Sequence, residues 1–180
     1  MSVYDFTVKA QDGRSVSLAD YQGKVLLIVN TATGCGFTPQ YTQLQELYRE
    51  HQPDGLEILD FPCNQFAGQA PGTDEEIHTF CTGRFGITFP QFSKVDVNGE
   101  NADPLFRWLT ENTTFEGFDK NPAGLALGQM LKLKDKSFKT SSDVKWSFTK
   151  FLVGRDGKIL ARFEPMTDLK KVKAAVEAAL

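Results

Sequence analysis

The strongest constraint on the fold is a pair of continuous apolar segments, residues 25–31 and 56–61, separated by one amphipathic segment. Apolar runs without polar alternation are typical of strands that are buried on both faces of a sheet. Between them, residues 39–51 carry apolar side chains at helical spacing, with Thr38 and Pro39 as the expected N-cap and first residue. Because strand–helix–strand crossovers are right-handed, the two strands are expected to be parallel neighbours in one sheet.

Turn and capping residues indicate the remaining elements. They predict a β-hairpin over residues 6–10 and 15–18, a helix that opens with a capping box at residues 73–76, a weaker strand over 91–97, a helix over 104–110, a β-hairpin over 148–153 and 158–163, and a final helix capped by Thr167. Residues 112–143 have no clear period, and we expect a long surface insertion there. This order predicts an α/β protein with a thioredoxin fold, to which an N-terminal β-hairpin and an inserted surface segment are added.

Length, charge and cysteine content narrow the class of protein. The 180 residues are most simply one domain, spanning residues 1–180, and the net charge of −3 gives no reason to expect a nucleic acid as partner. No signal-peptide segment or membrane span is visible, so we expect a soluble, cytoplasmic protein. Three cysteines argue against a disulfide framework, and two distant histidines without a CxxC pair argue against a zinc site. No metal and no cofactor are therefore expected.

Cys35 is the candidate reactive group. It follows the first apolar segment and stands three residues before Thr38, where the helix is expected to start. The positive end of a helix and its unpaired N–H groups favour a thiolate over a thiol. The sequence therefore predicts a cysteine with a lowered pKa on a strand-to-helix loop.

Three segments carry a resemblance to a known family. They are TGCGFTPQY at residues 33–41, DFPCNQFAGQ at residues 60–69 and KWSFTKF at residues 145–151. In content and order they resemble the glutathione peroxidase family, and the likeness extends over nearly the whole chain. The resemblance implies a peroxidase that reduces hydrogen peroxide and organic hydroperoxides.

The same resemblance implies roles for four residues. The residue that matches Cys35 attacks the peroxide O–O bond, and those that match Gln69 and Trp146 lie beside it. An amide and an indole N–H are uncharged donors, which stabilise a thiolate and the charge on a leaving oxygen. Many family members carry asparagine where this chain has Ser147, whose side chain is shorter and has one donor. A backbone role at this position would tolerate that change. No histidine or carboxylate stands in the matching motifs, so water or the thiol's own proton is expected to protonate the leaving oxygen.

The regeneration of Cys35 depends on a second thiol. Peroxide leaves Cys35 as a sulfenic acid, and in thioredoxin-dependent members of the family the cysteine that matches Cys81 resolves it. The helical stripe of Ile77, Phe80 and Cys81 by itself predicts a buried and inert thiol. With the resemblance, we expect a Cys35–Cys81 disulfide that is reduced by thioredoxin, with Cys63 uninvolved.

Two alternatives stay open. One is a peroxidase in which glutathione attacks the sulfenic acid directly, and the other is a peroxide sensor or relay protein that passes a disulfide to a partner. The sequence leaves the natural reductant, the preferred hydroperoxide and the oligomeric state open, and also whether selenocysteine naturally occupies position 35.

Overall fold

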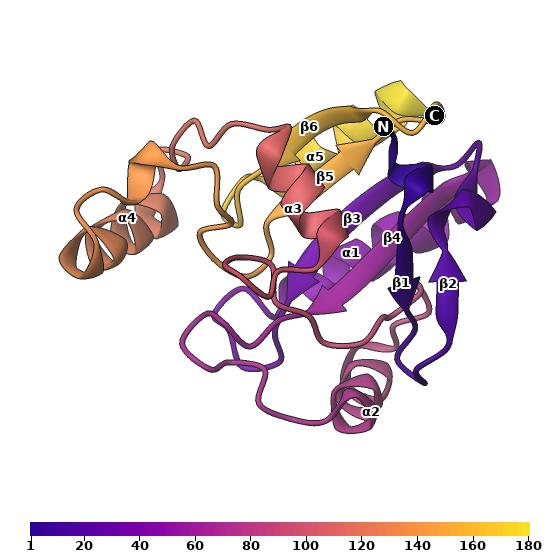
Figure 1. The fold of residues 1–180 in the computed structure, drawn as a ribbon, viewed down its shortest axis with the longest axis horizontal. Coiled ribbons are helices and arrows are strands. Elements are labelled where there is room, and N and C mark those ends of the chain that lie inside the picture. Colours follow the sequence, from indigo (N-terminus) through magenta and orange to yellow (C-terminus); the bar gives the residue numbers. More distant parts are fainter.

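The computed structural model describes residues 1–180 and is built around a four-stranded sheet (Figure 1). The strands β3 (Val25–Thr31), β4 (Leu56–Pro62), β5 (Lys150–Val153) and β6 (Ile159–Phe163) lie in the order β4-β3-β5-β6. β3 is parallel to β4 and antiparallel to β5, and β5 is antiparallel to β6. Both the parallel pair and the late hairpin confirm the order predicted from the sequence.

Helices cover both faces of this sheet. In Figure 1, α3 (Pro104–Glu111) lies in front of the strands, and α1 (Gln40–His51) and α5 (Leu169–Ala179) lie behind them. The other helices are α2 (Asp74–Phe85) and α4 (Pro122–Lys134), and short 3-10 helices cover Val3–Asp5, Leu18–Tyr21, Gln52–Asp54 and Phe138–Thr140. β1 (Thr7–Lys9) and β2 (Ser15–Ser17) form the predicted N-terminal hairpin. No helix is both long enough and apolar enough to cross a membrane.

The pleat of the sheet separates an aromatic face from a face that carries charge. Phe106 of α3 packs its ring 5.3 Å from Phe61 and 6.3 Å from Phe151, measured between ring centroids. Because side chains alternate along a strand, the preceding residues Asp60 and Lys150 point to the opposite face, toward α1. Both charged side chains are fully buried there.

Two predicted helix caps are wrong, because each hydroxyl has another partner. The N-cap of α1 is Pro39, and the hydroxyl of Thr38 instead contacts the loop before the helix. The N-cap of α5 is Asp168, while Thr167 donates its hydroxyl to Asp119 at 2.8 Å. The prediction that Thr73 caps the second predicted helix is confirmed, since its hydroxyl accepts the N–H of Glu76 at 3.1 Å.

The predicted strand over residues 91–97 is also wrong. This segment makes only isolated bridges, such as those from Gln91 to Asp60 and from Phe92 to Ala10. Its backbone donors are bonded to other groups; the N–H of Lys94, for example, donates to the Asp74 side chain at 2.8 Å. The alternating apolar residues of this segment therefore pack beside β4, but the segment forms no continuous ladder of strand hydrogen bonds.

The surface insertion contains a helix that the sequence analysis did not predict. α4 projects away from the sheet in Figure 1. Asn121 caps it, and Pro122 occupies its first turn, which is a usable helix-start signal. Gly124 and Gly128 interrupt the apolar pattern of α4, so its helical periodicity was not recognised in the sequence.

Candidate active site

The loop between β3 and α1 holds Cys35 through its own backbone. The N–H of Cys35 donates to the Thr38 hydroxyl at 2.9 Å, and that hydroxyl donates to the carbonyl of Ala32 at 2.8 Å. The sulfur in turn accepts the N–H of Phe37 at 3.3 Å. These bonds fix the thiol in a tight turn, where a backbone donor already points at it.

The pKa of Cys35 is raised, so the prediction of a lowered pKa is wrong. Burial is the largest cause, since the residue is only 7% exposed. Three groups act in the opposite direction: the Phe37 N–H, the Trp146 side chain as a hydrogen-bond partner, and the positive charge of Lys150. The helix contributes less than expected because α1 starts only at Gln40. Burial therefore dominates, and local donors and one cation oppose it.

Gln69 lies against the Cys35 loop. Its carbonyl accepts the N–H of Gly34 at 2.9 Å and the hydroxyl of Thr33 at 3.5 Å. A Cβ on Gly34 would lie 3.3 Å from the same carbonyl oxygen, so a glycine allows this close approach. The side-chain Oε1 of Gln69 is buried and has no hydrogen-bond partner.

Trp146 reaches the same thiol from the segment before β5. Its carbonyl accepts the Asn30 side-chain amide at 3.1 Å and the Thr149 hydroxyl at 2.9 Å, and its ring lies 5.8 Å from that of Phe66. Asn30 was missed in the sequence, although a polar residue inside an apolar strand was a visible signal. The structure thus brings Cys35, the Gln69 loop and Trp146 together.

Ser147 is fully buried directly after Trp146, and its hydroxyl makes no hydrogen bond. The next residue, Phe148, has a φ of 72°, which is the left-handed region that bulky residues rarely adopt. Such backbone strain is concentrated at functional sites.

Cys81 lies in a different environment. It is fully buried in α2, where the side chains of Tyr41 and Gln91 bond to it and the Asp60 carboxylate lies close enough to act on its charge. Burial, followed by the charge of Asp60, raises the pKa of Cys81 to about 11. None of these three groups is among those that act on Cys35.

All three cysteines are free thiols. Cys63 is also fully buried, and it donates to the Gln65 side chain at 3.5 Å. Burial raises the pKa of Cys63 as well.

Lys150 is a charged residue at the site that the sequence analysis did not single out. It is fully buried, and its ammonium donates to the Gln40 side chain at 2.8 Å and to the Phe148 carbonyl at 2.6 Å. Burial lowers the pKa of Lys150 to about 7. A lysine at the start of an apolar strand was the available signal.

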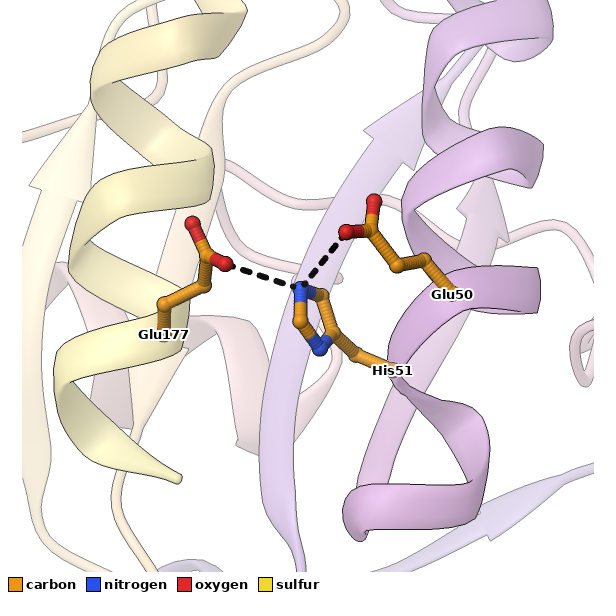
Figure 2. Close-up of side chains that lie close together, drawn as sticks. All are labelled: Glu50, His51 and Glu177. Atoms are coloured by element: carbon orange, nitrogen blue, oxygen red, sulfur yellow. Dashed lines mark ion pairs between the residues drawn. The ribbon is translucent and has the colours of Figure 1, made fainter.

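One other cluster has side chains of the kinds that bind metal ions. Figure 2 shows His51 between Glu50 and Glu177, with Nε2 3.3 Å from Glu177 and 3.8 Å from Glu50. The Nδ1 atom lies 3.2 Å from Asp54, and Glu50 pairs with Lys173 at 2.7 Å. These contacts describe an ion-pair cluster that joins the ends of α1 and α5, apart from Cys35.

Comparisons with known proteins agree with this geometry. The family described as glutathione peroxidase matches residues 3–110. The glutathione peroxidase homolog BsaA of Bacillus subtilis is 46% identical over 173 residues, covering 96% of this chain and 94% of the relative. The hydroperoxy fatty acid reductase of Synechocystis is 45% identical over 179 residues, covering 99% and 96% of the two chains.

Solved structures show the same fold. The crystal structure of T. cruzi GPX1 superposes with a TM-score of 0.70 at 31% identity, covering 99% of this chain and 96% of that one. A thiol:disulfide interchange protein of the thioredoxin family from Chlorobium tepidum has a TM-score of 0.59 at 16% identity, covering 97% and 92% of the two chains, and shares the fold alone. With a family match over more than half of its length and relatives matched end to end, the chain belongs to the glutathione peroxidase family and is an oxidoreductase of the thiol peroxidase type.

Proposed function

We propose that this enzyme reduces hydrogen peroxide and organic hydroperoxides with Cys35 as its peroxidatic cysteine. The observation that carries the proposal is the surroundings of the Cys35 sulfur: a backbone N–H, the Trp146 side chain and the Lys150 cation all favour its charged form. The charge on a thiolate and the charge that develops on a leaving oxygen both need such donors. No negative charge is among the groups that act on this thiol.

Two unpaired polar atoms, on Gln69 of the loop that contacts Gly34 and on Ser147 directly after Trp146, support a bound polar substrate. The Gln69 Oε1 and Ser147 Oγ atoms are buried without partners. Buried polar atoms without partners are uncommon, and they are expected where a ligand completes the hydrogen bonding. The hydroxyl end of a hydroperoxide has both a donor and an acceptor. The name of the Synechocystis relative, hydroperoxy fatty acid reductase, supports organic hydroperoxides as substrates here.

The cycle that we propose has two steps. The Cys35 thiolate attacks one peroxide oxygen, the O–O bond breaks, and a sulfenic acid and an alcohol or water result. Cys81 then attacks the sulfenic sulfur, water leaves, and a Cys35–Cys81 disulfide forms, which thioredoxin reduces by thiol–disulfide exchange. Because Cys81 is buried in α2, this helix has to open locally before the sulfurs meet, since a disulfide tolerates only a short Cα separation. This chemistry fits a reducing compartment such as the cytoplasm.

The Cys81 thiol favours thioredoxin over glutathione as the reductant. A thiol on the same chain has a high effective concentration once α2 opens, so it is expected to reach the sulfenic acid before millimolar glutathione does. A glutathione-dependent cycle would not need Cys81, and a sensor would pass the disulfide to a partner without sustained turnover.

Steady-state peroxide consumption, run with thioredoxin and with glutathione side by side, tests this proposal. Cys35→Ser is expected to lose all turnover, because it removes the thiol that is proposed to attack the peroxide. Cys81→Ser is expected to keep the first reaction with peroxide but to lose thioredoxin-supported turnover, and Cys63→Ser is the matched control that keeps both.

Peptide mapping after one equivalent of peroxide gives an independent readout. The expected result is a Cys35–Cys81 link with Cys63 free. A Cys35–Cys63 link, or full thioredoxin-supported activity without Cys81, would place glutathione first. Turnover that persists in Cys35→Ser would remove the mechanism altogether.

A further inference from the structure

Lys150 is a buried lysine whose ammonium makes no hydrogen bond to a carboxylate. Its ammonium is bonded only to two neutral oxygens, the side chain of Gln40 at 2.8 Å and the carbonyl of Phe148 at 2.6 Å. Glu164 faces Lys150 from the end of β6, but that carboxylate is bonded to Arg162 at 2.9 Å. A buried ammonium is costly unless it is paired, and the one carboxylate that acts on Lys150 is shared with Arg162, so a second negative charge that forms nearby would stabilise the ammonium.

The sheet places this cation below the Cys35 loop. Lys150 pairs with Val29 of β3, the strand that leads directly into the loop. Its partner Gln40 lies in the first turn of α1, on the other side of the same loop. Cys35 and Glu164 are the two acidic groups whose charge acts on Lys150, and Lys150 is the one charged group that acts on Cys35.

The backbone beside Lys150 is strained in a way that serves this contact. Phe148 adopts a φ of 72°, and its carbonyl accepts the ammonium two residues further along the chain. A left-handed conformation is costly for a bulky residue. The strain is retained where it holds the ammonium in place.

We propose that Lys150 is the positioning residue that supplies the counter-charge of the Cys35 thiolate. This inference rests on the proposed peroxidatic role of Cys35. Before the reaction, the proton of the thiol passes to the lysine amine, which gives a thiolate and an ammonium. As the S–O bond forms and the O–O bond breaks, the electron pair leaves on the alkoxide, which takes up the proton shared by the pair. A thiol and a hydroperoxide thereby become a sulfenic acid and an alcohol, and the lysine is neutral again.

Burial lowers the pKa of Lys150 to about 7, so near neutral pH part of the molecules hold an amine that can take up the thiol proton. Burial raises the pKa of the Cys35 thiol, so the thiolate–ammonium pair is the minor form, and the proposal makes it the form that reacts with the peroxide. The sequence analysis assigned the proton to water or to the thiol itself and passed over Lys150, which stands in the third motif.

The test compares Lys150→Met with Lys145→Met. Both lysines are buried in the same segment, but the ammonium of Lys145 lies over the Phe115 ring at 5.1 Å and is not among the groups that act on Cys35. The readout is the rate at which iodoacetamide alkylates Cys35, followed by peptide mapping and extended from neutral pH into the alkaline range in which a thiol with a raised pKa titrates. Lys150→Met is expected to raise the midpoint of this profile by about one to two pH units, which slows alkylation at neutral pH about 10- to 100-fold. Lys145→Met is expected to leave the midpoint in place.

A second variant keeps the inference testable if Lys150→Met does not fold, which thermal unfolding will show. Gln40→Glu puts a carboxylate where the amide now accepts the ammonium at 2.8 Å, so the lysine charge is neutralised with little change in side-chain size. The midpoint for Cys35 is again expected to rise. An unchanged midpoint in the folded variants overturns the inference, even if Cys35→Ser is inactive. If the midpoint is raised but Cys35→Ser is still active, the Lys150–Cys35 interaction is supported and the proposed function of Cys35 is overturned instead.

Discussion

Cys35 and Cys81 are both buried thiols with raised pKa values, but opposite charges lie beside them. Lys150 acts on Cys35, and Asp60 acts on Cys81. Both charged residues are register partners of Val29 on β3: Asp60 pairs with it from β4, and Lys150 pairs with it from β5. Helix α1 contacts both charges: the Gln40 side chain accepts a hydrogen bond from Lys150, and the Tyr41 hydroxyl donates one to Asp60.

This difference separates the roles of the two cysteines. Burial raises the pKa of both thiols and hydrogen-bond partners lower both, so the sign of the neighbouring charge is what differs: the Lys150 cation favours a thiolate at Cys35. At Cys81 the carboxylate adds to burial, and the pKa reaches about 11. Cys81 is therefore kept protonated inside α2 and is not expected to compete for peroxide. In the proposed cycle it becomes a nucleophile once the helix opens and carries it away from Asp60.

The largest expected effect concerns the donors on the Cys35 side. Gln69→Ala and Trp146→Phe each remove a side chain that is proposed to donate at the thiol, and loss of one such donor typically costs about 10²–10³ in rate. Trp108→Phe is the matched control, because this second tryptophan lies on α3 with its ring 5.4 Å from Phe6. Stopped-flow measurement of the first reaction with hydrogen peroxide gives the rate constants. Wild-type rates in both variants would show that burial and Lys150 alone define the reactive thiol.

The sequence predicts some features of the fold and of the candidate site better than others. The buried strands were found because a short continuous apolar run between turn residues is typical of a strand covered on both faces. Cys35, Gln69 and Trp146 are predicted as site residues because they stand in recognisable motifs. The caps at Thr38 and Thr167 were wrong because a hydroxyl that fits a cap was bonded elsewhere.

The charges near the two thiols could not be predicted from the sequence, for a different reason. Asp60 and Lys150 are 90 positions apart and become neighbours of Val29 only through strand order and register. The sign of the pKa shift at Cys35 was wrong because the burial of the loop, which outweighs the helix, depends on elements distant in the chain. Local pattern predicts which residue reacts, whereas tertiary packing decides its charge.

A smaller effect is expected on the Cys81 side, in the pH dependence of stability. Burial raises the pKa of Asp60 from 3.8 to about 6, although Thr31, Tyr41 and Gln91 all donate to its carboxylate. The folded-state pKa lies above the unfolded value, so the contribution of Asp60 to stability is fully present below pH 3.8 and is lost as the pH rises through about 6. A shift of this size corresponds to about 3 kcal/mol.

Urea unfolding of the wild type and of Asp60→Asn at pH 4 and pH 7 measures this contribution. The Asn side chain does not titrate, so the variant is expected to be closer to the wild type in stability at pH 7 than at pH 4. Asp20→Asn, at an exposed position, is the control with no such difference. If the gap between Asp60→Asn and the wild type is the same at both pH values, Asp60 is not the buried acid that distinguishes the two thiols.

The smallest effect is expected at Ser147, on the Cys35 side. Its hydroxyl is buried and makes no hydrogen bond, so Ser147→Ala removes a group that the folded protein has desolvated without compensation. Thermal stability should be equal or slightly higher, and the rate of the first peroxide reaction should fall by less than about threefold, well below the loss expected for a preorganised donor. The same stopped-flow assay, run beside Gln69→Ala, makes the two losses directly comparable. A loss as large as that of Gln69→Ala would mean that the hydroxyl pairs with the hydroperoxide itself, and Ser147 would then join Trp146 among the donors that make Cys35 different from Cys81.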